Sequence, residues 1–569
     1  MADPTSIRDI DLTPLAGKSY FSIEREWREE FIYFLMVDRF QDDTARPVAA
    51  GPDRSAGIAT PNSFYGGTIR GVTRNLDYIA GLGCTAIWLS PVFENNPEAY
   101  HGYDINNYLR IDPHFGTKQD LIDLVEAAHG FRMNGHPFPI RIILDVVINH
   151  SGDNWFYPGG FRYFYSNDTE FDFGDFRRHD RPVPVELRNK DWYHRRGEMR
   201  DYDAYPENQH GDMYGLKDYA NDDDGIGSDV INTLIKAHCY WMREADVDGF
   251  RVDAVKHMGE LACARFCSNI REYAYALGKR NFFLFGEVAS PSDDIYNRYI
   301  GQNTSRQNGD NTVFFGLNSV LDFRLAEGVF ADHDNAPLRD VLKGNEGPQT
   351  LFNRLEAQRE RALNRGEIGR YLVTFVDNHD AFWQPGRFAS GASDDQVIGA
   401  IGFLLSALGT PCIYYGTEQG FSGSGGDNQM REAMFDKAPG GKSLLNPECR
   451  IYQEIAKIAD VVRRHEPLRF GRMYYRQIAD ESLSFGLPFG STYTLAFSRL
   501  LYGQEILIAY NVSGAVRHER VIVDATLHPD PSQMTYLYGK LGALAVQTAP
   551  SGARFVQLDL EAHQFVILA

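Results

Sequence analysis

The stretch GFRVDAVKH, residues 249–257, predicts one short buried strand that ends on an acidic residue. Side chains alternate between the two faces of a strand, so Arg251 and Asp253 point one way while Phe250 and Val252 point the other. A carboxylate beside a guanidinium stays ionised because the positive charge lowers its pKa. Such a carboxylate is a poor proton donor but can act as a nucleophile or stabilise a cation. The pair therefore predicts either a nucleophile at Asp253 or an ordinary buried Arg–Asp ion pair.

Seven further runs rich in β-branched, aliphatic and aromatic residues lie along the chain, with helical patterns between them. The eight runs are residues 31–40, 84–91, 141–150, 249–253, 282–287, 312–316, 371–380 and 411–416. Continuous apolar strands that alternate with helices predict a parallel sheet buried on both faces. Eight of them favour a closed (β/α)8 TIM barrel of the α/β class, and a doubly wound open sheet is the alternative.

Polar residues gather at the carboxyl ends of these runs, which is the face of a TIM barrel that carries catalytic residues. They are Asp38, Ser90, Asn149, His150, Asp253, Glu287, Asp377, Asp380 and Tyr415. We therefore expect the functional site at this face.

Two segments depart from a plain barrel. Residues 151–229 are rich in Asp, Tyr, Phe and Gly and far exceed an ordinary strand-to-helix loop, which predicts an inserted B domain after the third strand. After about residue 468 helical patterns give way to short strands, which predict a C-terminal β-sandwich over residues 468–569. Residues 1–150 and 230–467 then make up the barrel.

The charge of the chain narrows the classes of partner. The 569 residues carry a formal net charge of −20, which argues against nucleic acids and membrane surfaces because both are bound through basic faces. A neutral or weakly charged substrate fits better. No organic cofactor is expected, and the sequence makes no prediction of oligomeric state.

The cysteines and the N-terminal residues bear on the compartment. The six cysteines are scattered and predict free buried thiols, and Cys263 and Cys267 have no His or Cys partner nearby to complete a metal site. No apolar run reaches the length of a membrane span, and residues 1–20 lack a basic segment followed by an apolar one. The sequence predicts a cytoplasmic location unless a leader has been removed.

Two more acids end predicted strands beside Asp253. Glu287 closes the run FFLFGE, and Asp380 closes the run that ends in FVDNHD. Retaining glycoside cleavage needs an ionised carboxylate as nucleophile about 5 Å from a protonated carboxyl that serves as acid and then base. We expect partial burial to raise the pKa of Glu287 and make it the acid, while Asp380 stabilises the positively charged transition state.

Histidines lie near the same strand ends, at His101, His150, His257 and His379. Histidines with carboxylates can bind zinc, but these residues lack the close spacing of a zinc motif. Hydrogen-bond donors to sugar hydroxyls are needed in a site for polyhydroxylated substrates, and that interpretation is preferred.

The chain resembles the α-amylase family, glycoside hydrolase family 13. The motifs DVVINH (145–150), GFRVDAVKH, GEV (286–288) and FVDNHD (375–380) are similar to the four signature regions of that family, in order and spacing. Residues 64–94 and GTPCIYYGTEQG (409–420) resemble its second-strand and eighth-strand signatures. The resemblance covers about residues 30 to 420 and implies a (β/α)8 barrel, an inserted B domain and a C-terminal β-sandwich.

The resemblance also implies roles for individual residues. Asp253 matches the family nucleophile, Glu287 the acid/base and Asp380 the transition-state stabiliser. The residues that match contacts to the sugar at the cleavage point are His101, Tyr103, His150, Arg251 and His379. Lys256 and His257 resemble a pair on the leaving-group side, and Ala254 differs from the Val of α-1,6-specific members, so α-1,4 linkages are favoured. Trp383 is a further candidate for stacking on a sugar, because it follows Asp380 on the catalytic face.

A structural calcium ion is a further implication of the resemblance. Its ligands would be Asn149, Asp218 and the carbonyl oxygen of His257, together with an acid of the B domain that cannot be aligned. Oxygen ligands of this kind suit Ca²⁺.

Three functions follow as hypotheses. The first is a retaining α-glucoside hydrolase that cleaves α-1,4 bonds in starch-type glucans or malto-oligosaccharides through a covalent intermediate on Asp253. The second is an α-glucan transglycosylase with the same residues, in which a sugar hydroxyl takes the place of water. The third is a glucan-binding protein without catalysis, against which the presence of all three acids argues.

Overall fold

The computed structural model describes residues 3–42, 44, 57–221, 226–290, 293–300, 304–305, 313–314, 316–327, 337–352, 354, 372–382, 385–438, 441–488, 490 and 493–569. Eight parallel strands form one sheet in the order β16-β13-β12-β7-β2-β1-β18-β17. Their bounds are β1 Ile32–Leu35, β2 Ala86–Leu89, β7 Arg141–Val146, β12 Gly249–Val252, β13 Phe283–Gly286, β16 Ser319–Val320, β17 Val373–Thr374 and β18 Thr410–Tyr414. A parallel bridge between Leu321 and Val373 joins the two edge strands. The sheet thus closes into the predicted (β/α)8 barrel, and the open-sheet alternative is wrong.

The sixth strand lies elsewhere than predicted. The apolar run at 312–316 contains β15 (Val313–Phe314), which pairs antiparallel with β14 (Thr304–Ser305) outside the barrel. The barrel position belongs to β16, which pairs in parallel with β13 through Phe285 and Ser319. Only two residues long and half polar, β16 has too weak a hydrophobic pattern to stand out in the sequence.

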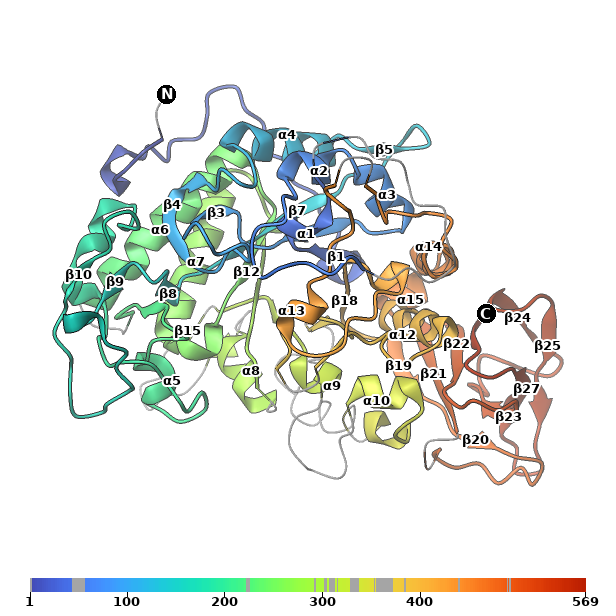
Figure 1. The fold of residues 1–569 in the computed structure, drawn as a ribbon. Helices are drawn as coiled ribbons and strands as arrows, with labels where there is room; N and C mark the ends of the chain where they lie inside the picture. The colour runs from blue at the N-terminus through green and yellow to red at the C-terminus, as the bar shows by residue number, and fades with distance from the viewer. Residues whose placement is uncertain are drawn as a thin grey trace.

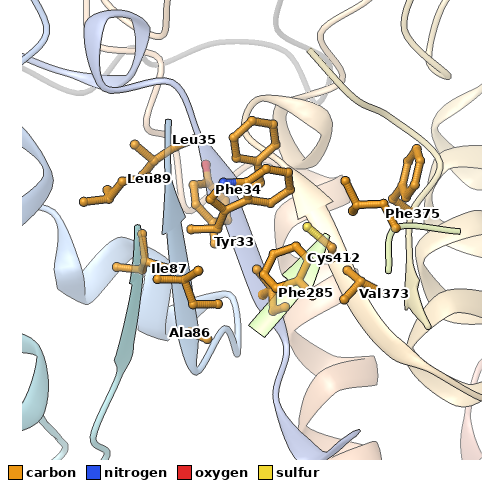
Figure 2. Packing of buried hydrophobic residues seen from close by; sticks show 14 of the residues in the cluster. Tyr33, Phe34, Leu35, Ala86, Ile87, Leu89, Phe285, Val373, Phe375 and Cys412 are labelled. Atoms are coloured by element: carbon orange, nitrogen blue, oxygen red, sulfur yellow. The ribbon is translucent and has the colours of Figure 1, made fainter. Parts of the chain in front are cut away.

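The interior of the barrel is filled by side chains. Figure 2 shows buried side chains of several barrel strands, among them Phe34 and Phe285, and the Phe285 ring packs edge-on against Trp88. Every residue of β1, β2, β12 and β13 is buried, as expected for strands covered on both faces. Phe34 stacks on Trp88 with 3.7 Å between ring centroids. Because the interior is solid, the space for a ligand lies at the strand ends and not within the barrel.

Helices surround the barrel (Figure 1). Their bounds are α1 Val37–Phe40, α2 Ile69–Thr73, α3 Leu76–Gly81, α4 Lys118–His129, α6 Ile226–Ala245, α7 Glu260–Ala276, α8 Asp293–Tyr299, α9 Phe323–Glu327, α10 Leu338–Lys343, α12 Asp394–Ser406, α13 Asp427–Met430, α14 Arg450–Arg464 and α15 Glu466–Phe470. Helix α4 begins at a capping box, in which the Thr117 hydroxyl accepts from the Asp120 N–H and the Asp120 carboxylate accepts from the Thr117 N–H. The short hairpins β3–β4 (Phe93–Asn95, Ile105–Ile111) and β5–β6 (Arg132–Met133, His136–Pro137) lie in the connections.

Between β7 and α6 the chain leaves the barrel and forms a small separate layer, called here the insertion. Its elements are β8 His150–Ser151, β9 Trp155–Phe156, β10 Asp175–Phe176, α5 Glu207–His210 and β11 Lys217–Asp218. Strand β9 pairs with β10, and β8 pairs with β11, both antiparallel. In Figure 1 the insertion is coloured teal and lies at the opposite end of the molecule from the C-terminal strands in red.

The C-terminal part contains two antiparallel sheets, with strand orders β19-β21-β22-β28-β24-β25 and β20-β23-β27-β26. The bounds are β19 Arg472–Tyr475, β20 Ile478–Ala479, β21 Thr494–Leu501, β22 Gln504–Asn511, β23 Arg517–Ile522, β24 Gln533–Tyr538, β25 Ala543–Ala545, β26 Gln547–Thr548, β27 Arg554–Leu560 and β28 Phe565–Leu568. Inward side chains such as Leu507, Val521 and Val556 form one apolar core. This is the predicted all-β sandwich.

No helix within the described ranges is both long enough and apolar enough to cross a membrane.

Candidate active site

Two of the predicted acids lie on neighbouring strands at the carboxyl end of the barrel. Asp253 follows β12 directly and Glu287 follows β13 directly. Main-chain hydrogen bonds continue the parallel ladder past the strand ends, from the Asp253 N–H to the Val146 carbonyl and from the Glu287 N–H to the Val252 carbonyl, each 2.9 Å. The positions of both acids are therefore set by the sheet itself.

The Arg251 guanidinium lies at the centre of the site and is fully buried. It forms ion pairs with Asp145 over 2.9 Å, with Asp253 over 2.5 Å and with Glu287 over 2.8 Å. One positive charge thus faces three carboxyl groups, so a proton on one of them lowers the repulsion within the cluster.

The Asp253 and Glu287 side chains lie close enough for a hydrogen bond, which forms when one of the two carboxyl groups carries a proton. Burial raises the pKa of Asp253 well above its usual value, and the charge of Glu287 adds to this effect. Burial acts in the same sense on Glu287, but the Arg251 charge and the Ala254 N–H, which donates to Glu287 Oε2 over 3.0 Å, lower the pKa of Glu287 overall.

These shifts run opposite to the sequence prediction, which had Glu287 protonated and Asp253 ionised. The sequence placed Arg251 beside Asp253 alone. In the structure the same guanidinium also reaches Glu287, and Asp145 adds a negative charge next to Asp253. Ala254 adopts a left-handed backbone conformation with φ of 50°, and this turn carries its N–H to Glu287.

Asp380 lies in the loop after β17 and is partly exposed. Arg431 donates from Nη2 to Asp380 Oδ1 over 2.7 Å, and His379 Nε2 is 3.1 Å from Oδ2. Burial raises the pKa of Asp380 to about 7, against the lowering effect of Arg431. The negative charge of Glu287 also raises this pKa, so Asp380 and Glu287 lie within electrostatic reach of each other.

Aromatic rings line the mouth of the barrel, the opening at the carboxyl ends of its strands where these acids lie. The Tyr103 ring lies nearly parallel to the rings of His101 and His379, with ring centroids 5.9 and 5.5 Å away. Its hydroxyl donates to Asp145 Oδ2 over 2.9 Å and is 2.8 Å from His379 Nε2. These rings form a flat surface beside the acids, where the apolar face of a sugar can lie.

The predicted histidines are neutral at pH 7. Burial lowers the pKa of His101 to about 3, that of His150 to about 4 and that of His257 to about 4, and it lowers the pKa of His379 well below its usual value. The His150 Nε2 is buried and makes no hydrogen bond within the part of the chain that the structure describes. A neutral imidazole can both donate and accept, which suits sugar hydroxyls.

The insertion closes one side of the site. Lys256 pairs with Asp203, and the His257 imidazole donates from Nδ1 to the Asn208 carbonyl over 2.8 Å. Both predicted leaving-group residues, Lys256 and His257, thus bridge η6 (Val255–His257) to the insertion. Trp383, the remaining predicted sugar contact, lies outside the described residues.

Two of the three predicted calcium ligands, Asn149 and Asp218, are in contact. The Asn149 amide donates from Nδ2 to Asp218 Oδ1 over 3.3 Å, and Asn149 Oδ1 is buried without a hydrogen bond inside the described ranges. A proton on His257 would disfavour a proton on His150, so η6 lies near this pair. Asp218 also pairs with His194 over 2.5 Å. No group of three or more His, Cys, Asp or Glu able to hold a metal occurs among the residues described, so such a site would depend on amide and main-chain oxygens.

Two residues of the site, Asp145 and Arg431, were not predicted from the sequence. Asp145 interrupts an otherwise apolar strand, and an inward-pointing acid inside a buried run is a signal that could have identified it. Arg431 directly follows the four-residue helix α13 and reaches Asp380 across the mouth, and nothing in its local sequence indicates this contact.

Comparison with known proteins agrees with this geometry. Residues 34–444 match the family model of the α-amylase catalytic domain. The chain is 27% identical over 553 residues to an α-amylase of Streptomyces lividans, covering 86% of this chain and 55% of that protein. It is 30% identical over 493 residues to a β/α-amylase of Paenibacillus polymyxa, covering 84% of this chain and 34% of that protein. The chain thus spans about half the length of the first relative and a third of the second.

Solved structures extend the similarity over nearly all of the chain. The crystal structure of an α-amylase from Geobacillus thermoleovorans, in complex with acarbose, superimposes with a TM-score of 0.68 at 25% identity, covering 96% of this chain and 99% of that one. A further relative by sequence, a cyclomaltodextrin glucanotransferase of Klebsiella oxytoca, is 27% identical over 509 residues, covering 81% of this chain and 68% of that protein. With a family model that matches from the first barrel strand to beyond the eighth, and with Asp253 and Glu287 side by side at the mouth, this chain belongs to the α-amylase family.

Proposed function

We propose that the protein is a retaining α-glucoside hydrolase that cleaves α-1,4 bonds in starch-type glucans or malto-oligosaccharides. The observation that carries the proposal is the contact between the Asp253 and Glu287 carboxyl groups, with Asp380 in electrostatic reach of Glu287. Inverting enzymes need about 6.5–9.5 Å between their two carboxyl groups to admit a water molecule, whereas retaining enzymes place them about 5 Å apart. A pair in hydrogen-bond contact favours the retaining arrangement.

In the first step Glu287 donates its proton to the glycosidic oxygen while an Asp253 oxygen bonds to the anomeric carbon. The bond from that carbon to the leaving sugar breaks, and the leaving sugar departs with a free hydroxyl. Burial favours the protonated form of Asp253 in the free protein, so the proposed mechanism requires that substrate binding leaves the proton on Glu287. Arg251 holds Asp253 in its ionised form during the attack.

In the second step Glu287, now a carboxylate, takes a proton from water as the water oxygen attacks the anomeric carbon. The ester bond to Asp253 breaks and the α-anomer leaves. Ionised Asp380 stabilises the positive charge of the sugar in both transition states. The stacked rings of Tyr103 and His379 hold the sugar in place.

A glucanotransferase is the second candidate, because relatives named as cyclomaltodextrin glucanotransferases match most of this chain. It differs only in the second step, where Glu287 deprotonates a sugar hydroxyl in place of water. A non-catalytic glucan-binding protein is the third.

A time course of products from maltoheptaose distinguishes the three candidates, with anomeric form and chain length followed together. Shorter oligomers released as the α-anomer support the hydrolase. Products longer than the substrate indicate the transferase. Unchanged maltoheptaose contradicts both enzymatic functions.

We also propose a structural Ca²⁺ held by Asn149 Oδ1, the Asp218 carboxylate and the His257 carbonyl. The buried Asn149 oxygen without a partner in the described residues supports this proposal. When bound, the ion would tie the end of β7 to the insertion. It takes no part in the two steps above.

A further inference from the structure

A second cavity lies in the insertion, away from the acids. It has a volume of about 440 Å³, which is within the range of about 300–1,000 Å³ that small-molecule sites occupy. Residues of β9, the loop after it and the segment around Tyr214 line it, and none of the three catalytic acids contributes to its wall. It is therefore a site that the proposed mechanism does not use.

The charges around this cavity balance. Its wall contains three basic side chains and three acidic ones, which are Arg162, Arg177 and Lys217 and Asp153, Glu198 and Asp212. They pair with each other: Arg162 with Glu198, Arg177 with Asp153 over 2.6 Å, and Lys217 with Asp212 over 3.4 Å. A wall with no excess charge favours a neutral ligand, and paired charges at the rim offer donors and acceptors to hydroxyl groups.

Aromatic side chains supply the remaining surface. Phe161 is 71% exposed and Tyr214 is 76% exposed, so both rings are open to a ligand. Trp155, fully buried at the base, has an indole N–H that meets no acceptor in the part of the chain described. A buried donor without a partner costs free energy unless a ligand or water satisfies it. Flat rings with a free donor form a surface that suits a sugar.

A series of tyrosines connects the cavity to the catalytic mouth. Tyr214, at the rim of the cavity, lies beside Tyr202, with ring centroids 5.7 Å apart. Tyr202 in turn packs edge-on against His257, with centroids 5.9 Å apart. His257 lies three residues after Ala254 in the turn that also carries Asp253, so a sugar chain that leaves the acids on this side would run over Tyr202 toward Tyr214.

We propose that this cavity is a second glucan-binding site, which holds the distal end of a neutral α-glucan chain whose scissile bond lies between Asp253 and Glu287. That the ligand is an α-glucan is taken from the proposed function. It adds a preference for long chains, because only a chain that extends past Tyr202 reaches both places.

The test measures binding apart from cleavage. In an Asp253→Asn background, titration calorimetry with maltoheptaose is compared with and without the double substitution Phe161→Ala/Tyr214→Ala. Loss of both exposed rings should raise the Kd about tenfold. Trp155→Phe keeps a ring at the base but removes the N–H, and should raise the Kd about fivefold. Tyr275→Ala is the matched control, since Tyr275 is 61% exposed on α7, outside the cavity, and should leave the Kd unchanged.

In the protein with Asp253 intact, the ratio of kcat/KM for maltoheptaose to that for maltotriose should fall about tenfold in the double variant. An unchanged Kd and an unchanged ratio would overturn the second site while the hydrolase remains. Absence of cleavage in the wild-type protein would overturn the proposed function, and the calorimetry would still decide whether the cavity binds the glucan. Circular dichroism melting curves establish that each variant is folded.

Discussion

Arg431 donates a hydrogen bond to the Asp380 carboxylate over 2.7 Å, although the two residues are 51 positions apart in the sequence. The guanidinium favours the ionised form of Asp380, whose pKa burial has raised to about 7. If Arg431 is replaced by Gln, that pKa should rise further, because the largest effect that lowers it is then lost. Since the proposed role needs ionised Asp380, the acid limb of the kcat/KM profile should move to higher pH. Activity at pH 6 should then fall more than activity at pH 8.

The control for this prediction is Arg463→Gln, which removes a guanidinium that is 55% exposed on α14. Its pH profile should match that of the wild type. An Arg431→Gln profile with an unmoved acid limb would show that Asp380 is not the group that titrates there.

Asp253→Asn should reduce turnover by at least about 10⁴-fold, because the amide cannot form the covalent ester. The fold should persist, since Asn keeps the shape and one hydrogen-bond acceptor for Arg251. Turnover of maltoheptaose and a thermal melt, measured together, check this. Retained full turnover in Asp253→Asn would refute the assigned nucleophile.

Glu287→Gln tests the role of Glu287 as the acid. With an aryl glycoside whose leaving group needs no proton, this variant should still form the covalent intermediate.

Asp145→Ala should destabilise the protein strongly, although Asp145 never touches the substrate in the proposed mechanism. It removes one carboxylate from the fully buried Arg251 and the acceptor for the Tyr103 hydroxyl. Loss of one partner from a buried ion pair costs about 3–5 kcal/mol. Urea unfolding should show the change as a lower midpoint. Asp123→Ala, on the exposed face of α4, should change the unfolding free energy by less than about 0.5 kcal/mol.

Calcium removal tests the proposed ion. If Ca²⁺ binds at Asn149 and Asp218, a hundredfold excess over its Kd stabilises the folded state by about 2.7 kcal/mol. Treatment with EDTA should then lower the melting temperature, and added Ca²⁺ should restore it. Asp218→Asn should abolish the response to EDTA, whereas Asp168→Asn, an exposed acid of the same insertion, should keep it. A wild-type melting temperature insensitive to EDTA and to Ca²⁺ would contradict the proposal.

The positions of the acids could be predicted from the sequence because they lie at strand ends. Asp253 and Glu287 could be placed together because each ends a short apolar run, and parallel strands bring their carboxyl ends to one face. The sixth strand was misplaced for the opposite reason, since Ser319–Val320 has almost no hydrophobic pattern and owes its position to pairing with β13.

The pKa shifts of Asp253 and Glu287 could not be predicted from the sequence, because they depend on contacts between barrel strands. Asp145 lies on β7 and Arg251 on β12, and whether the guanidinium touches one carboxylate or three depends on the register between strands. Arg431 poses the same difficulty. Its partner is set by the path of the chain after β18, which no local pattern encodes.

The bonds from Lys256 to Asp203 and from His257 to Asn208 have a consequence for how the protein is made. Each joins positions about fifty residues apart, so the leaving-group side of the mouth is completed only when the insertion has docked onto η6. Contacts of long sequence separation form late in folding because closing the intervening loop costs entropy. During refolding, therefore, the helical signal, which comes from local contacts, should return before activity, which needs the docked insertion.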